Sequence, residues 1–476
     1  MFRKPLIVIA LIGTVLISTS MSASIASNVK NTSDMSVNIQ NLLQEYIDDS
    51  GTPGAAVVLI DHGKMQFFYS GNMALEGNPV TENTIFEIGS ITKVFTTLAL
   101  MDMVDKGMMQ LDDPIEKYLP GVKVPELDGK KITLRHLATH TSGIARMPDN
   151  FSPSDPTNPY QDYTVERLYN YLQSCTLTKA PGNSFEYSNV GMGLLGHILS
   201  IHAGKTYEQL VQSLIAKSLT MPNTSVSITS ELATNFASGH HLQQEVSHWD
   251  FTPAFAGAGA LRSNITDIAN FLAANIGENV SPLSSMLQKC HKKQCEETLD
   301  TSFGLGWILS KSNEEKLIWH NGSTGGFRSY LGFNPKTQKG VAILSNSTAD
   351  WPDEFGSVIL DPNYQRLIVD RTLANNPEYL NKFVGSYVIV FPDDLSKQEL
   401  KISVFGRLLV FDFPEGDVNM HYPESYGVFG LKGFPDGKVY FSFDDSGDIS
   451  KVEARLISNG AIVWQATPIS HTAIPK

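Results

Sequence analysis

Ser90 and Lys93 are the first residues whose types and spacing could support covalent chemistry. After them, apolar residues recur at helical spacing at Ile91, Val94, Phe95, Leu98 and Met101. This pattern predicts a helix that begins near Ser90 and carries Ser90 and Lys93 on one face. A buried lysine with a lowered pKa could take the proton of the serine hydroxyl and make it a nucleophile. The alternative is a capping serine followed by a solvated lysine, and the same four-residue pattern recurs at Ser27–Lys30.

Tyr187 and Asn189 form a second candidate group. They precede a helix expected from about Val190 to Ile201, where small and apolar residues alternate with helical spacing. A tyrosine at this place could act as a general acid or base, and the asparagine could bind a substrate amide. The pattern alone is weak, because Tyr379-Leu380-Asn381 repeats it.

His320-Asn321-Gly322 is the third group. It ends a predicted strand and leads into Ser323. The triplet His202-Ala203-Gly204 shows that a His-x-Gly sequence also occurs elsewhere in the chain. We therefore infer a catalytic role for these three groups only from their order along the chain and from the helices and strands that carry them.

Metal and disulfide alternatives involve other histidines and the cysteines. His136 and His140 lie four residues apart, but no acidic third ligand stands at the expected spacing, so we expect them to make structural hydrogen bonds. Cys290 and Cys295 enclose a short polar loop that could close as a disulfide in an oxidising compartment. A zinc site formed by these cysteines and His291 lacks a fourth ligand. We expect neither a metal nor an organic cofactor.

The elements that must position these residues follow from periodicity. We expect an opening helix at Ile39–Tyr46, then a hairpin of strands at Ala55–Ile60 and Met65–Tyr69. Residues 90 to 277 are mostly helical in pattern, apart from a polar, proline-rich surface loop from Pro148 to Tyr160. Sheet returns with strands at Lys316–His320, Ser329–Phe333 and Gly340–Leu344, followed by a helical pattern over residues 354 to 374. The fold class is therefore α+β: an antiparallel sheet flanked by helices, with a helical insertion.

The C-terminal part has a different texture. Beyond Pro377, short aromatic or alternating strands are expected at Leu400–Val404, Leu408–Phe413, Val439–Phe443 and Ile462–Ala466. We expect a catalytic domain at residues 27–376 and a small all-β, barrel-like domain at residues 377–476.

The net charge disfavours nucleic acid as a partner, and the N-terminal residues indicate the compartment. The 476 residues carry 36 Lys and Arg against 49 Asp and Glu, a formal net charge of −13 that disfavours nucleic acid. Arg3 and Lys4 precede an apolar run, and Ser24-Ile25-Ala26 fits a cleavage site, so residues 1–26 are read as a signal peptide. An uncleaved membrane anchor is the alternative. The expected location is periplasmic or secreted, with no membrane span after cleavage.

Together, the three groups occur in the order found in the serine penicillin-recognising superfamily, which this chain resembles. Further stretches resemble relatives of class C β-lactamases: Phe86–Gly89, Leu111–Pro114, Ile132–Gly143 and Gly257–Ser263. The resemblance covers about residues 38–375, and the tail with Phe383–Tyr387 is more loosely similar to a lipocalin-like β-domain. The resemblance to the superfamily implies that Ser90 is the acylated nucleophile, that Lys93 and Tyr187 transfer its proton, and that Asn189 binds a substrate amide. It also implies an oxyanion hole formed by the backbone N–H groups of Ser90 and Ser323, with His320, Asn321 and Gly322 along the substrate.

The departure from class C enzymes is His320, which stands where those enzymes usually carry lysine. Protonated His320, or Arg328 nearby, could attract a substrate carboxylate. The expected activity is a serine hydrolase acting on small molecules, either β-lactams or D-alanyl peptides. The alternatives are a small-ester esterase and a non-catalytic sensor of cell-wall peptides.

Overall fold

The computed structural model describes residues 32–469, except 242, 278–280, 299, 313–314, 362–363, 365–368, 392–393, 414–417, 432–433 and 459. The predicted signal peptide, residues 1–26, lies outside the described residues. None of the described helices is both long and apolar enough to cross a membrane.

The central sheet forms because its strands are apolar on both faces. Within the described residues, eight antiparallel strands lie in the order β2-β1-β14-β13-β12-β11-β10-β9. In β1, Ala55, Val57 and Leu59 pack on one face, and Ala56, Val58 and Ile60 pack on the other. Such alternation over two buried faces is expected of a sheet covered by helices on both sides. The strands are β1 (Gly54–Asp61), β2 (Lys64–Gly71), β9 (Cys295–Glu296), β10 (Thr301–Phe303), β11 (Ile308–Ser312), β12 (Glu315–Ser323), β13 (Arg328–Asn334) and β14 (Lys339–Ser345).

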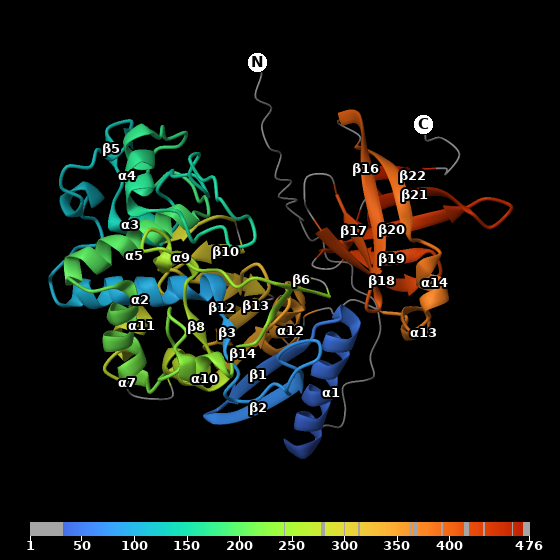
Figure 1. The fold of residues 1–476 in the computed structure, drawn as a ribbon, viewed down its shortest axis with the longest axis horizontal. Helices are drawn as coiled ribbons and strands as arrows, with labels where there is room; N and C mark the ends of the chain where they lie inside the picture. Colours follow the sequence, from blue (N-terminus) through green and yellow to red (C-terminus); the bar gives the residue numbers. More distant parts are fainter. Residues whose placement is uncertain are drawn as a thin grey trace.

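Two helices cover one face of this sheet, and a larger helical region covers the other (Figure 1). The first two are α1 (Thr32–Ser50) and α12 (Trp351–Leu360). The helical region consists of α2 (Thr92–Asp105), α3 (Leu134–Ala138), α4 (Val165–Ser174), α5 (Asn189–Ala203), α6 (Tyr207–Val211), α7 (Lys217–Leu219), α8 (Ser230–Ala233), α9 (Ala256–Gly259), α10 (Ile265–Ile276) and α11 (Ser284–Cys290). Short turns and ribbons complete it: η1 (Gly89–Ile91), η2 (Ile115–Tyr118), η3 (Gln212–Ala216), β3 (Phe86–Glu87), β4 (Glu126–Leu127), β5 (Lys130–Lys131), β6 (Gly239–His241), β7 (Gln244–Val246) and β8 (Arg262–Ser263).

The C-terminal strands close on themselves. Within the described residues, the antiparallel strands β15 to β22 form a closed barrel in chain order, and β22 pairs back with β15. Figure 1 shows this barrel beside α1 and α12, with the helical region on the opposite side of the molecule. Its strands are β15 (Gly385–Phe391), β16 (Asp394–Phe405), β17 (Leu408–Asp412), β18 (Val418–Ser425), β19 (Val428–Leu431), β20 (Phe434–Phe443), β21 (Ile449–Leu456) and β22 (Ile462–Pro468).

The predicted fold class is confirmed, including the hairpin, the three returning strands and the β-rich tail. The single helical pattern over residues 354 to 374 is wrong in detail. Helix α12 ends at Leu360, and the following helices are α13 (Arg371–Ala374) and α14 (Pro377–Asn381). Asp361 is extended and precedes Pro362, and a residue before proline disfavours the helical conformation.

The cysteines are free thiols, so the disulfide considered for Cys290 and Cys295 is absent. Cys290 Sγ lies 4.0 Å from the carbonyl oxygen of Thr97, whereas Cys295 Sγ lies 3.8 Å from that of Thr139. The two sulfur atoms therefore serve different contacts. His291 of the zinc alternative instead has Nε2 2.8 Å from Asn275 Oδ1.

Candidate active site

Ser90 lies in η1, a turn that runs directly into α2. Gly89 before it has a φ of +49°, and a Cβ atom there would come within 2.7 Å of the Ser323 backbone nitrogen. Only glycine therefore allows η1 to approach the end of β12 this closely. The approach brings the turn that carries Ser90 against the end of β12 that carries Ser323, the two residues expected to form the oxyanion hole.

Lys93, in the first turn of α2, is fully buried, with 0% of its surface exposed. Its Nζ lies 2.8 Å from Ser90 Oγ and 2.7 Å from the carbonyl oxygen of Ala258. Burial, reinforced by the positive charge of Arg146, lowers the Lys93 pKa well below its usual range. The solvated-lysine alternative is therefore wrong, and the neutral amine that a base requires is favoured.

Tyr187 reaches the same point from the segment before α5. Its hydroxyl hydrogen-bonds Ser90, and Lys93 Nζ lies 4.9 Å from the centre of its ring. Burial raises the Tyr187 pKa to about 12, although the hydrogen bond between Tyr187 and Ser90 and the charge of Arg146 act in the opposite direction. Tyr187 is therefore a protonated phenol at neutral pH.

Asn189 is the first residue of α5 and lies on the same side of the site. Its backbone N–H donates to the carbonyl oxygen of Arg146 over 3.0 Å, and its side chain hydrogen-bonds Tyr160. Ser188 caps the helix by accepting the backbone N–H of Gly191 over 2.9 Å. The cap fixes where α5 begins, and hence where Tyr187 and Asn189 point.

His320 in β12 faces Tyr187, with ring centres 6.4 Å apart. Its Nδ1 lies 2.5 Å from the carbonyl oxygen of Asn321, and since a carbonyl only accepts, Nδ1 carries the proton and Nε2 is an acceptor. Burial and the nearby Lys93 lower the His320 pKa to about 3. This lowered pKa argues against the expectation that protonated His320 attracts a substrate carboxylate near neutral pH.

The rest of the β12 end is oriented by other contacts. Gly322 packs against the turn before Ser90, since a Cβ atom there would lie 2.1 Å from the carbonyl oxygen of Ile88. The Asn321 amide donates to Asp353 Oδ1 in α12 over 2.6 Å, and Arg328 also pairs with Asp353. Thus Asn321 and Arg328 share one partner, whereas His320 is on the Tyr187 side of the strand.

His140 and Arg146 are site residues that the sequence reasoning did not assign. The ring of His140 stacks on that of Tyr187, and the Arg146 guanidinium carbon lies 5.1 Å from the centre of the Tyr187 ring. His136, in contrast, accepts the backbone N–H of Thr133 at the start of α3. The expected structural hydrogen bonds of both histidines are present. The signal that could have marked His140 was its place in Thr139-His140-Thr141-Ser142-Gly143, one of the stretches that resemble class C relatives.

Aromatic side chains, among them Trp249 and Tyr160, lie on one side of the site. The rings of Trp249 and Tyr160 have centres 5.3 Å apart, and a Cβ atom on Gly325 would lie 2.6 Å from Trp249 Nε1. Arg262 braces the segment around Trp249 by donating to the carbonyl oxygen of Trp249 over 2.8 Å. Trp249 was also missed, because nothing in its local sequence marks it.

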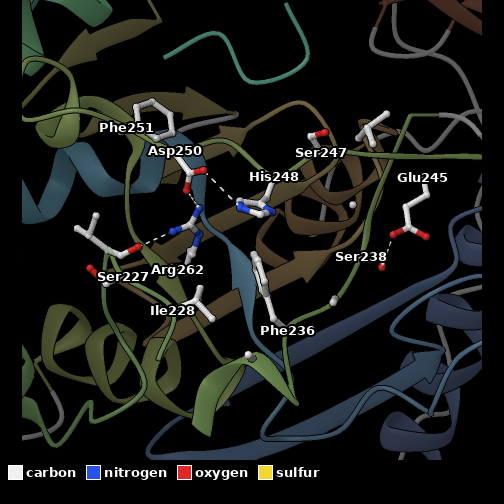
Figure 2. Close-up of a pocket in the computed structure, with 15 residues that line it drawn as sticks. Ser227, Ile228, Phe236, Ser238, Glu245, Ser247, His248, Asp250, Phe251 and Arg262 are labelled. Carbon is white, nitrogen blue, oxygen red and sulfur yellow. Dashed lines mark hydrogen bonds and ion pairs between the residues drawn. The ribbon is translucent and has the colours of Figure 1, made fainter. Parts of the chain in front are cut away.

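A separate pocket of about 920 Å³ lies behind this segment (Figure 2). It is lined by Phe236, His248, Asp250, Phe251 and Arg262, among others, and Figure 2 shows Arg262 beside Asp250 and His248. Ser90, Lys93, Tyr187 and His320 do not line it. The pocket is therefore distinct from the site at Ser90.

Comparisons with known proteins agree with this geometry. A family model described as "Beta-lactamase" matches residues 39–357. A beta-lactamase of Yersinia enterocolitica is 28% identical over 351 residues, covering 65% of this chain and 86% of the relative. The D-alanyl-D-alanine-carboxypeptidase/endopeptidase AmpH of Escherichia coli K12 is 27% identical over 325 residues, covering 64% of this chain and 83% of the relative. The solved structure of a class C beta-lactamase superposes with a TM-score of 0.62 at 22% identity, covering 71% of this chain and 99% of the other.

Proposed function

The chain belongs to the Beta-lactamase family, and from this membership and its site we propose that it is a serine hydrolase that forms an acyl-enzyme on Ser90. The observation that carries the proposal is the buried Lys93 amine 2.8 Å from Ser90 Oγ. A lysine kept neutral by burial is a base, and a hydroxyl at hydrogen-bond distance is its proton donor.

Acylation then proceeds as a balanced transfer. Ser90 Oγ bonds to the substrate carbonyl carbon while its proton passes to Lys93 Nζ. The backbone N–H groups of Ser90 and Ser323 stabilise the oxyanion, a contribution of about 10²–10³ in rate for each such donor. As the bond to the leaving nitrogen or oxygen breaks, that atom takes a proton through Tyr187. Water then attacks the ester, loses a proton to the same groups, and releases the acid and free Ser90.

We propose β-lactams or D-alanyl peptides as the first substrate class, because the named relatives are beta-lactamases and a D-alanyl-D-alanine-carboxypeptidase/endopeptidase. Small esters are the second class. One observation favours them: His320 is neutral where a charge for a substrate carboxylate was expected. For both classes we propose that the enzyme works in the periplasm or outside the cell, after removal of residues 1–26.

The test is mass spectrometry of residues 27–476 after incubation with a penicillin, a D-Ala-D-Ala peptide and a short-chain nitrophenyl ester. We expect an acyl adduct on the peptide that contains Ser90 from at least one substrate, and none in Ser90→Ala. The matched control is Ser218→Ala, an exposed helical serine outside the site, which should be acylated like the parent. Turnover by Ser90→Ala at the parent rate would show that another nucleophile acts.

A further inference from the structure

Asp353, in the first turn of α12, joins two residues of the β12 and β13 ends. Its Oδ2 accepts from Arg328 Nε over 2.7 Å and lies 2.5 Å from Arg328 Nη2. Its Oδ1 accepts from the Asn321 side-chain amide over 2.6 Å. Both oxygens of the carboxylate are thus used, one for a guanidinium and one for an amide.

This cluster flanks the place where a substrate would lie. Strand β11 pairs with β12 only as far as Trp319, so residues 320–323 of β12 have a free outer edge in the described chain. Arg328 stands directly opposite Ser323 in the β12–β13 register, and Asn321 lies two residues before Ser323. The cluster therefore lies beside the proposed oxyanion donor in the strand register, and charges interact over about 10 Å at moderate salt.

The charges along this strand end cancel. His320 is neutral, and the positive charge of Arg328 is opposed by Asp353 at ion-pair distance. The Arg328 and Asp353 side chains are 22% and 25% exposed, so solvent screens the pair only in part. A substrate carboxylate beside the leaving group would thus meet no net positive charge here.

We propose that Asp353 is a specificity-determining residue, which cancels the charge of Arg328 and so favours substrates without a carboxylate next to the scissile bond. The inference rests on the proposed acyl-enzyme function and deepens it: Asp353 shifts the site from carboxylate-bearing β-lactams and peptides toward neutral esters. Arg328 is then a latent carboxylate-binding group.

The test is a double-mutant cycle with two substrates that share one acyl group. The substrates are 4-nitrophenyl phenylacetate and 3-carboxy-4-nitrophenyl phenylacetate, and the readout is the ratio of kcat/KM for the anionic over the neutral ester. Asp353→Asn retains an oxygen that can accept from Asn321 and should raise the ratio about fivefold, because Arg328 loses its counter-charge. Arg328→Gln should lower the ratio by a similar factor, because Asp353 then repels the anionic ester. The double variant has neither of the two charged side chains, so its ratio of kcat/KM values should return to that of the parent.

A different pattern would overturn the proposal. If Arg328 already binds the carboxylate despite its pairing, Asp353→Asn changes little and the double variant stays as low as Arg328→Gln. The double variant keeps the test decisive if Asp353→Asn fails to fold with an unpaired arginine. Asp61→Asn, the same charge change at the end of β1, should leave the ratio unaltered. Absence of any acyl adduct on Ser90 would instead refute the proposed function, whereas acylation with an unchanging ratio refutes only this inference.

Discussion

The rings of His140 and Tyr187 lie nearly face to face, with centres 4.4 Å apart and planes 30° apart. His140 Nδ1 also accepts the backbone N–H of Ser188 over 3.1 Å, the residue between Tyr187 and the start of α5. The His140 backbone has a φ of +57°, a conformation that few residues other than glycine and asparagine adopt readily. One side chain thus holds both the ring and the backbone that present Tyr187 to Ser90.

We therefore predict that His140→Asn lowers kcat about tenfold while KM changes little, a loss in the range caused by small misplacement of a catalytic group. Asparagine tolerates the backbone conformation and can accept from Ser188, but it cannot stack on Tyr187. His136→Asn is the matched control, since the His136 side chain hydrogen-bonds the backbone at the start of α3 and at Lys131 and makes no ring contact with Tyr187 among the described residues. Equal kinetics in the two variants would show that the stacking does not position Tyr187.

Lys93 and Tyr187 give a second prediction. Lys93→Met and Tyr187→Phe should each lower the acylation rate at least about 10²-fold, the scale of lost general acid–base catalysis. Lys93→Arg tests charge against basicity, because arginine keeps a positive charge and does not give up its proton. Activity of Lys93→Arg near that of the parent would rule out Lys93 as the base.

The fold was predictable because its local patterns agree with its tertiary structure. Strand β1 is apolar at successive positions and is buried on both faces, so the strand was evident from sequence. Helix α2 was found from its apolar spacing, although Thr92, Lys93, Thr96 and Thr97 are buried as well. Those polar residues are satisfied by distant partners, for example Thr96 Oγ1 by the Tyr207 hydroxyl over 2.6 Å, and no local pattern reveals such partners.

The site was predictable only in part, for the same physical reason. Ser90, Lys93 and Tyr187 belong to short motifs in a fixed order, and the structure brings them together. The environment of His320 is a tertiary property, so its ordinary pKa of about 6.5 was a poor guide to its charge. Likewise, Arg328 and Asp353 lie on different elements 25 residues apart, and their pairing appears only once α12 packs on the sheet.

The low pKa of His320 gives a third prediction. With a pKa of about 3, His320 stays neutral from pH 5 to 8, so it adds no titration to the ratio of kcat/KM for anionic and neutral esters. We expect that ratio, measured across this range, to show no step near pH 6.5. His320→Gln is the control and should give the same profile shape. A step in the parent that disappears in His320→Gln would show that His320 does become charged in the active enzyme.

The fourth prediction concerns the boundary between the proposed domains. The barrel has its own core, in which Phe383, Phe411, Phe429 and Phe441 pack together. It also contacts α1, where Arg407 and Arg371 both pair with Asp49, a residue that is only 2% exposed. Removing residues 377–476 deletes Arg407 but leaves Arg371, so Asp49 keeps a partner.

We therefore expect residues 27–376 to fold with the far-ultraviolet circular dichroism of a mixed α+β domain and to be acylated at Ser90 like the longer chain. The melting temperature should fall, because the surface of α1 that contacts the barrel becomes exposed. The control is Ser90→Ala in the same truncated chain, which should remain unmodified. Loss of cooperative unfolding on truncation would argue against two separate domains.

His421, in the barrel strand β18, provides the last prediction. It is buried against Phe411, with ring centres 4.0 Å apart, and neither ring nitrogen has a hydrogen-bond partner among the described residues. Burial lowers its pKa to about 3. Below pH 6.5 His421 is protonated in the unfolded chain, whereas in the folded barrel it stays neutral until about pH 3. The free energy of unfolding therefore falls as the pH drops through this window.

His421→Leu removes both the unpaired polar group and this pH dependence. We expect it to raise the free energy of barrel unfolding by about 1–3 kcal/mol at pH 7, the usual cost of an unsatisfied buried group, and by about 2 kcal/mol more at pH 5. Hydrogen exchange of the amides of β17 and β18 at both pH values measures the difference. Phe411→Leu is the control, because it alters the same packing without a titrating group and should destabilise the barrel equally at pH 7 and pH 5. A gain for His421→Leu that does not grow on acidification would mean that the folded barrel accommodates the imidazolium, for instance by opening locally to water.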